Sequence, residues 1–336
     1  MRLRQSGSSW IVHAPAKLNL FLEVLGKRAD GFHELETLMV SVNLFDTLVL
    51  RQESSTQISL RCHYSGCVSR KVAAESALAS DEVPDGQDNL AVKAAELLRK
   101  KTGVNKGIHI ELFKRIPAEA GLAGGSSDAA AVLLALNRIW QLGLSRDELQ
   151  RYASEIGSDV AFFLSESPAA LCQGRGEIIR PLMKAPRLHF VIVKPDSGLS
   201  TAAVFRQCRP EAKPRGASKL AEYLQCGDLT NVGRNLFNSL QAPAESLNPE
   251  VGKLIEEFGR QPFVGHMMSG SGTSCFGVCR HRDEARMAAA RLKAPGIRIC
   301  RRSFRCALAC RLSVRSSGRI LSCRASSRRR RSTPTT

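Results

Sequence analysis

The chain has 336 residues, of which 43% are hydrophobic and 24% charged, and its formal net charge is +18. This length is sufficient for two domains, each with its own core, and the composition is that of a globular protein. No run of about 18 apolar residues is present, which excludes a transmembrane helix.

The positive charge is concentrated near the C-terminal end. Residues 298–336 contain twelve Arg, no Lys and no acidic residue, so the rest of the chain carries only six of the eighteen net positive charges. We therefore expect no nucleic-acid partner for the body of the protein. The basic segment is predicted to be a disordered tail. Two interpretations of it stay open: an arm that binds RNA or an anionic surface, or a translated extension without a role.

The cysteine pattern favours a reduced, cytoplasmic enzyme. There are eleven Cys, an odd number, and no close pair has the two-residue spacing of a zinc knuckle. Cys172 and Cys275 stand in apolar contexts and are predicted to pack in a core. The first apolar stretch is interrupted by His13, Pro15 and Lys17, which argues against a signal peptide.

Hydrophobic periodicity and turn signals predict the following elements in chain order. A strand or hairpin covers 10–25, and a second strand covers 37–52. A surface insertion is expected within 53–88. Further segments are a helix over 89–103 with Gly103 at its C-cap, a strand over 106–117, a helix over 126–141, a capped segment over 145–164 and a strand over 188–195.

The segment 115–131, RIPAEAGLAGGSSDAAA, predicts an anion-binding loop. Gly121, Gly124 and Gly125 let the backbone approach a ligand, and the helix that follows has Ser126 or Ser127 as its expected N-cap. Free N–H groups at a helix N-terminus bind phosphate. The loop matches neither the Walker A nor the Rossmann glycine pattern. A glycine-rich turn that only packs a helix is the alternative.

Three polar residues in apolar surroundings are further candidates. Lys17 and Asn19 are two residues apart and face the same side of a predicted strand, where they require partners or a ligand. Asp159 directly precedes the apolar run VAFFL. The structural alternatives are a solvated edge residue for Lys17 and a helix cap for Asp159.

Three segments, in order PAKLNLFLEV, PAEAGLAGGSSDAAAVLLALN and MMSGSGTSCFGV, resemble the three motifs of the GHMP kinases. The segments ADGFHEL, DNLAVKAAELL and IGSDVAFFL make the resemblance closest to the branch of the family that acts on a cytidine diphosphate alcohol. The resemblance runs from about His13 to Ile299. It implies an α+β fold with a ribosomal protein S5 domain 2-like, ATP-binding N-terminal domain (1–170), a ferredoxin-like C-terminal domain (171–299) and the tail (300–336).

The resemblance also implies a reaction. The expected activity is phosphorylation by ATP of the 2-hydroxyl of 4-diphosphocytidyl-2-C-methyl-D-erythritol, in the non-mevalonate isoprenoid pathway. Asp159 corresponds to the family's catalytic aspartate, which takes the hydroxyl proton, and Lys17 to its catalytic lysine, which keeps that carboxylate ionised. Mg²⁺ is expected with ATP. Ser126 is the candidate protein ligand of the metal, and no other is assigned.

The family's binding residues can be carried over where the motifs match. The cytosine is expected to stack between Phe32 and Phe205, with His33 hydrogen-bonded to its polar edge and Asn19 near the reacting alcohol. The remaining substrate candidates are Thr201, Gly270, Ser271 and Gly272. The ATP candidates are Pro117, Ala118, Glu119, Ala120, Gly121, Leu122, Ala123, Gly124, Gly125, Ser126 and Ser127.

Three positions depart from the family pattern. Phe32 stands where Tyr is more common, and Glu119 and Ala123 stand where glycine is frequent. Two other functions remain as alternatives: a GHMP kinase acting on mevalonate or homoserine derivatives, and an S5-like nucleic-acid-binding module without catalysis. A monomer and a homodimer are both compatible with the sequence.

Overall fold

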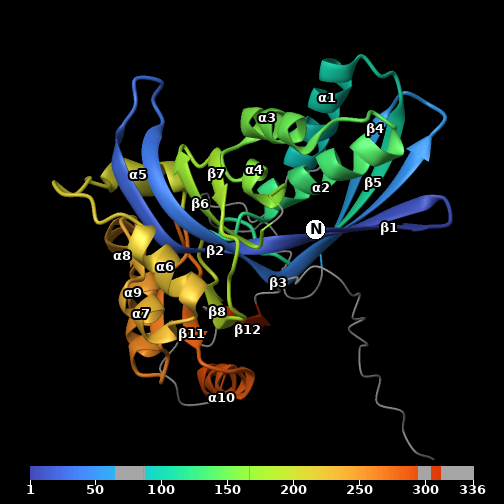
Figure 1. Ribbon diagram of the computed structural model, residues 1–336. Coiled ribbons are helices and arrows are strands. Elements are labelled where there is room, and N and C mark those ends of the chain that lie inside the picture. Colours follow the sequence, from blue (N-terminus) through green and yellow to red (C-terminus); the bar gives the residue numbers. More distant parts are fainter. Residues whose placement is uncertain (65–85, 87, 166, 294–303, 312–336) are drawn as a thin grey trace, which may run out of the picture.

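The computed structural model describes residues 1–64, 86, 88–165, 167–293 and 304–311. Figure 1 shows these residues arranged as two sheets, each covered by helices. The first sheet follows the order β1-β2-β3-β5-β4, with β6 paired to β3, β7 to β6 and β9 to β2. Its strands are β1 (Arg2–Ser6), β2 (Ser9–Lys27), β3 (His33–Glu53), β4 (Ile58–Tyr64), β5 (Gly107–Lys114), β6 (Ala169–Gly174), β7 (Ile178–Pro181) and β9 (Phe237–Asn238).

Four helices pack against the first sheet and bury its apolar side (Figure 1): α1 (Leu90–Thr102), α2 (Gly124–Ile139), α3 (Arg146–Ile156) and α4 (Val160–Phe163). The α1 helix begins with an Asn89 cap and ends at Gly103 with φ +70°, as the sequence predicts. The α3 helix begins with a capping box formed by Ser145 and Glu148. Alanines fill much of the α2 face, which lets this helix lie close to α1 and the strands.

The second sheet has the order β10-β11-β8-β12 and is antiparallel throughout. Its strands are β8 (His189–Pro195), β10 (Gly265–Met268), β11 (Cys275–Cys279) and β12 (Phe304–Arg311). Its helices are α5 (Thr201–Gln207), α6 (Ser218–Cys226), α7 (Leu229–Arg234), α8 (Gln241–Leu247), α9 (Pro249–Gly259) and α10 (Arg282–Lys293). Both halves mix helices and strands, so the expected α+β architecture is confirmed.

The β2 strand connects the two halves. It has 19 residues. Its residues 9–13 pair with β1, and Phe21 and Leu22 pair with the short strand β9. Leu22 and Val24 at its far end share a core with Val191 and Val193 of β8. Burial of this common apolar surface fixes the two halves to each other, and the residues near the middle of β2 lie at their junction.

The structure differs from the predicted boundaries in two places. The expected boundary at 170 falls inside β6, because β6 and β7 extend the first sheet to Pro181. Within the expected disordered tail, residues 304–311 form β12 on the edge of β8. That segment, FRCALACR, alternates like a strand, a local pattern that the overall richness in Arg conceals. Residues 65–85 of the expected insertion and residues 312–336 of the tail lie outside the described residues.

Candidate active site

Lys17 and Asn19 form a buried polar pair in the middle of β2. Their exposed fractions are 4% and 2%, and Lys17 Nζ donates a hydrogen bond to Asn19 Oδ1 at 2.5 Å. Asn19 Nδ2 in turn donates to Thr37 Oγ1 at 2.8 Å. The two residues share one side of the strand, as predicted. A solvated edge position for Lys17 is excluded by its burial.

Asp159, which is distant in the sequence, forms an ion pair with Lys17. It directly precedes α4, and its Oδ2 is 3.5 Å from Lys17 Nζ. The Asp159 side chain makes no capping hydrogen bond to α4 and remains 32% exposed, which leaves the cap interpretation without support. A buried ammonium held against an accessible carboxylate is a suitable arrangement for accepting a proton from a bound hydroxyl.

The predicted glycine loop leads into the N-terminus of α2. The helix begins at Gly124 with Ala123 as its N-cap, and no side chain caps it. The prediction of Ser126 or Ser127 as the N-cap is therefore wrong. Glycines at 124 and 125 permit the helix to start earlier and place both serines inside its first turns. The uncapped start leaves the first N–H groups of α2 available to a ligand.

A second glycine turn, 269–274, closes onto this loop. Ser269 Oγ donates to the Gly121 carbonyl at 3.0 Å and accepts from the Asn19 backbone N–H at 3.3 Å. Ser274 N donates to the Ala120 carbonyl at 3.2 Å. A Cβ built on Gly121, whose φ is +68°, would lie 1.9 Å from the Ser269 carbonyl oxygen. Close approach of the two loops therefore requires glycine at 121.

The two departures in the first loop, Glu119 and Ala123, have the left-handed backbone conformation that favours glycine. Glu119 and Ala123 have φ of +46° and +54°, a conformation that costs a side-chain-bearing residue about 1–2 kcal/mol. A Cβ on Gly198 would lie 2.6 Å from Glu119 Oε2, so the Glu119 side chain extends over the loop that follows β8.

Only some of the expected substrate residues lie close to one another. The rings of His33 and Phe205 lie 5.0 Å apart, and Thr201 Oγ1 is 2.9 Å from Ser271 Oγ. A Cβ on Gly270 would be 3.2 Å from Lys17 Nζ, which places the second glycine turn beside the catalytic candidates. Phe32 is 50% exposed and stacks against Arg175, not against Phe205.

A buried charge cluster below the first loop was not predicted. Lys114, at the end of β5, bonds to Asp46 of β3 and lies 2.7 Å from Asp128 Oδ2 of α2. Asp46 also accepts from the Arg115 and Ile116 N–H groups at 2.5 and 2.8 Å. The cluster ties α2 to the strands. Asp128 among alanines was the one available signal, but spacing alone could not reveal that its partners lie on distant strands.

Within this cluster, Asp128 has a raised pKa and one oxygen without a hydrogen-bond partner. Burial raises the pKa of its carboxyl to about 7, and attraction to Lys114 offsets only part of that effect. Asp128 Oδ1 and the neighbouring Ser127 Oγ are buried without a hydrogen-bond partner. Both are located in the first turns of α2, directly behind the glycine loop.

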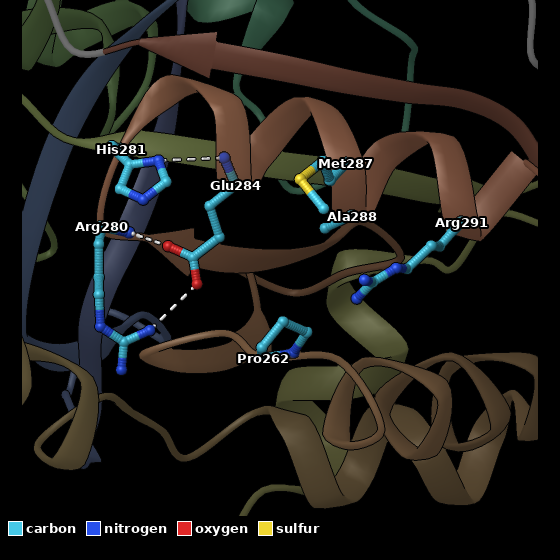
Figure 2. A pocket seen from close by; sticks show the side chains of 7 residues that line it. All are labelled: Pro262, Arg280, His281, Glu284, Met287, Ala288 and Arg291. Atoms are coloured by element: carbon cyan, nitrogen blue, oxygen red, sulfur yellow. Dashed lines mark hydrogen bonds and ion pairs between the residues drawn. The ribbon is translucent and has the colours of Figure 1, made fainter.

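A separate hollow lies on the C-terminal half, between α10 and the chain before β10 (Figure 2). Glu284 there accepts from the Arg280 N–H at 2.6 Å and from its guanidinium at 3.0 Å, while His281 Nδ1 accepts from the Glu284 N–H. Its wall includes none of the predicted site residues. Across the part of the chain that the structure describes, no helix has the length and hydropathy needed to span a bilayer.

Comparison with known proteins identifies the family of the chain. The family models "GHMP kinases N terminal domain" and "GHMP kinases C terminal" match residues 89–167 and 220–298. The 4-diphosphocytidyl-2-C-methyl-D-erythritol kinase of Pelotomaculum thermopropionicum is 40% identical over 282 residues, which cover 83% of this chain and 92% of that protein. The chain belongs to the GHMP kinase family.

Three further proteins are similar to the chain. The 4-diphosphocytidyl-2-C-methyl-D-erythritol kinase of Shouchella clausii is 41% identical over 80% of this chain and 84% of its own length. A crystal structure of 4-(cytidine 5'-diphospho)-2C-methyl-D-erythritol kinase matches with a TM-score of 0.70 and 35% identity, covering 90% of this chain and 99% of that one. Homoserine kinase from Cytophaga hutchinsonii, at 18% identity and a TM-score of 0.64 over 87% of this chain and 92% of that one, shares the fold.

Proposed function

We propose that this GHMP kinase transfers the γ-phosphate of ATP to the 2-hydroxyl of 4-diphosphocytidyl-2-C-methyl-D-erythritol. The observation that carries the proposal is the 3.5 Å contact between Lys17 Nζ and Asp159 Oδ2 beside the two glycine loops. The relatives named for this substrate, about 40% identical over most of their length, supply the identity of the acceptor.

In the proposed reaction Asp159 accepts the proton of the acceptor hydroxyl as that oxygen attacks the γ-phosphorus. Lys17, whose Nζ lies 3.5 Å from Asp159 Oδ2, stabilises the negative charge that develops on the attacking oxygen. Asn19 orients Lys17 through their hydrogen bond. Because phosphoryl transfer needs position and charge neutralisation more than covalent chemistry, this small set of residues is sufficient.

The first loop, residues 117–127, is the proposed ATP site. Its support is the uncapped start of α2, where backbone N–H groups and the positive end of the helix dipole face an anion. Gly270, Ser271 and Gly272 of the second turn close over the transferred phosphate from the other domain.

The residues present fit a Mg²⁺ ion that arrives with ATP. In the described parts of the chain no group of three or more His, Cys, Asp or Glu forms a cage for a metal, whereas Mg²⁺ in kinases is bound mainly by phosphate oxygens and water. The Ser126 hydroxyl in the first turn of α2 is the protein ligand we propose. When bound, the metal neutralises charge on the phosphates.

The cytidine is proposed to bind beside Phe32 and His33, where Phe205 packs on the His33 ring. Phe32 offers an exposed ring face for stacking, and His33, packed on Phe205, offers a ring nitrogen to the polar edge of the base. The Thr201 hydroxyl, bonded to Ser271, connects this area to the second glycine turn.

The proposal is tested by a substrate panel. Purified protein with ATP and Mg²⁺ is incubated with 4-diphosphocytidyl-2-C-methyl-D-erythritol, mevalonate or homoserine, and ADP release and product mass are measured. We expect turnover of the cytidine diphosphate substrate alone. Preferential phosphorylation of mevalonate or homoserine would contradict the proposed acceptor while leaving the fold assignment intact.

A further inference from the structure

The turn between β6 and β7, residues 174–177, is built to hold one shape. Gly174 and Gly176 have φ of +72° and +118°, which residues with side chains rarely adopt. Glu177 Oε2 accepts from the Arg175 backbone N–H at 2.5 Å. The same Glu177 side chain packs over Gly174, where an added Cβ would lie 2.7 Å from Oε2. The carboxylate therefore serves mainly to lock the turn.

The Arg175 side chain leaves this turn toward the proposed cytidine site. Its guanidinium carbon lies 4.7 Å from the centre of the Phe32 ring. Its ion pair with Glu177 is long, at 3.8 Å, and the side chain is 28% exposed. Stacking on an aromatic ring leaves the N–H groups at the edge of the guanidinium free to bind an anion.

Arg28, another cation close to Phe32, is already paired with acidic side chains. Arg28 donates to Glu34 at 2.7 Å and to Asp30 at 3.2 Å. Asp30 also accepts the Phe32 N–H, so this pairing shapes the loop that presents the ring. Arg175 therefore has the weaker acidic pairing of the two and the greater capacity to attract a phosphate.

The turn also adjoins the catalytic candidates. A Cβ on Gly176 would lie 3.4 Å from the carbonyl oxygen of Ser158, the residue before Asp159. Three residues upstream of Arg175, Cys172 pairs in register with Thr37, the hydrogen-bond partner of Asn19. A strand advances about 3.3 Å per residue, so the end of β6 at Gly174 lies about 7 Å along the strand from Cys172, and Arg175 follows in the turn.

We infer that Arg175 binds the diphosphate group that joins the cytidine to the alcohol of the substrate. This inference rests on the proposed function. The base is bound at Phe32, the acceptor hydroxyl lies at Asp159, and the diphosphate must extend between them. Arg175 contacts the Phe32 ring from the turn that adjoins Ser158, and it presents the planar donors that phosphate oxygens accept.

Competitive inhibition separates this role from support of the Phe32 ring. Inhibition constants of CDP and of cytidine, and KM for ATP and for the cytidine diphosphate substrate, are measured for the wild type, Arg175→Ala and Arg175→Lys. We expect Arg175→Ala to raise the CDP inhibition constant and the substrate KM about tenfold. Cytidine inhibition and the KM for ATP should change less than twofold, and Arg175→Lys should recover part of the CDP affinity.

Arg180→Ala, an exposed arginine on β7 of the same hairpin, is the matched control and should change none of these constants. Equal losses of CDP and cytidine affinity in Arg175→Ala would overturn the inference and assign the residue to the base site. Unchanged CDP affinity would also overturn it. Failure of the wild type to phosphorylate the substrate would instead reject the proposed function, so the two failures can be told apart.

Discussion

Replacing Asp128 by Asn should change how the stability of the protein depends on pH. Asp128 is fully buried, and its pKa is raised from 3.8 to about 7. Between these values the unfolded chain releases this proton while the folded protein keeps it, so the wild type loses stability as the pH rises. Asn cannot ionise, and its amide oxygen still accepts from Lys114.

The size of the effect follows from linkage. One proton bound only by the folded state costs about 1.4 kcal/mol for each pH unit, and integration from pH 5 to pH 7 gives about 2 kcal/mol. Urea unfolding of both proteins across this range measures the difference in free energy of unfolding, in which the other titrating groups cancel. We expect Asp128→Asn to gain about 2 kcal/mol relative to the wild type between pH 5 and 7.

Asp147→Asn, which removes an exposed carboxylate on α3, is the control for loss of one negative charge and should run nearly parallel to the wild type. Parallel curves for Asp128→Asn and the wild type would show that Asp128 is ionised in the folded protein. That result would refute the raised pKa of the Asp128 carboxyl.

Four further substitutions test the glycine loops and the cytidine site. Gly121→Ala should lower the free energy of unfolding by about 2 kcal/mol or more, because its Cβ would lie 1.9 Å from the Ser269 carbonyl oxygen. In the same urea assay, Gly125→Ala is the control: its Cβ would lie 3.5 Å from Leu90, so the free energy of unfolding should stay the same or rise. Glu119→Gly should raise the free energy of unfolding by about 1 kcal/mol by relieving φ +46°, and an unchanged value would show that this backbone conformation is not strained. Phe205→Ala should raise the KM of the cytidine diphosphate substrate about tenfold without affecting the KM for ATP, and a normal substrate KM would reject the proposed base site.

The Lys17–Asn19 pair and the first loop were accessible from the sequence because local pattern determines them. Lys17 and Asn19 face one side of β2 because a strand has a period of two, and they do bond to each other. The apolar periodicity of α1 and the glycine at 103 fixed both ends of that helix within a residue. The contact of Lys17 with Asp159 could be expected only through the family resemblance, since 142 positions separate the two residues.

Features that depend on distant strands could not be predicted. The bonds of Lys114 to Asp46 and Asp128 require β3, β5 and α2 to meet, and none of these residues forms a motif. The start of α2 at Gly124 was missed because serine is the usual capping residue, while here the tight loop at Ala123 sets the first turn. The strand β12 was missed because its segment is embedded in Arg-rich sequence.

The most direct test of the account compares phosphate transfer to 4-diphosphocytidyl-2-C-methyl-D-erythritol by the wild type and by Asp159→Asn, with ATP binding measured in parallel. We expect the variant to retain ATP binding and to lose about 10²–10⁴-fold in kcat, the contribution of a positioned general base. Asp159→Asn with near wild-type kcat would contradict the proposed role of the Lys17–Asp159 pair.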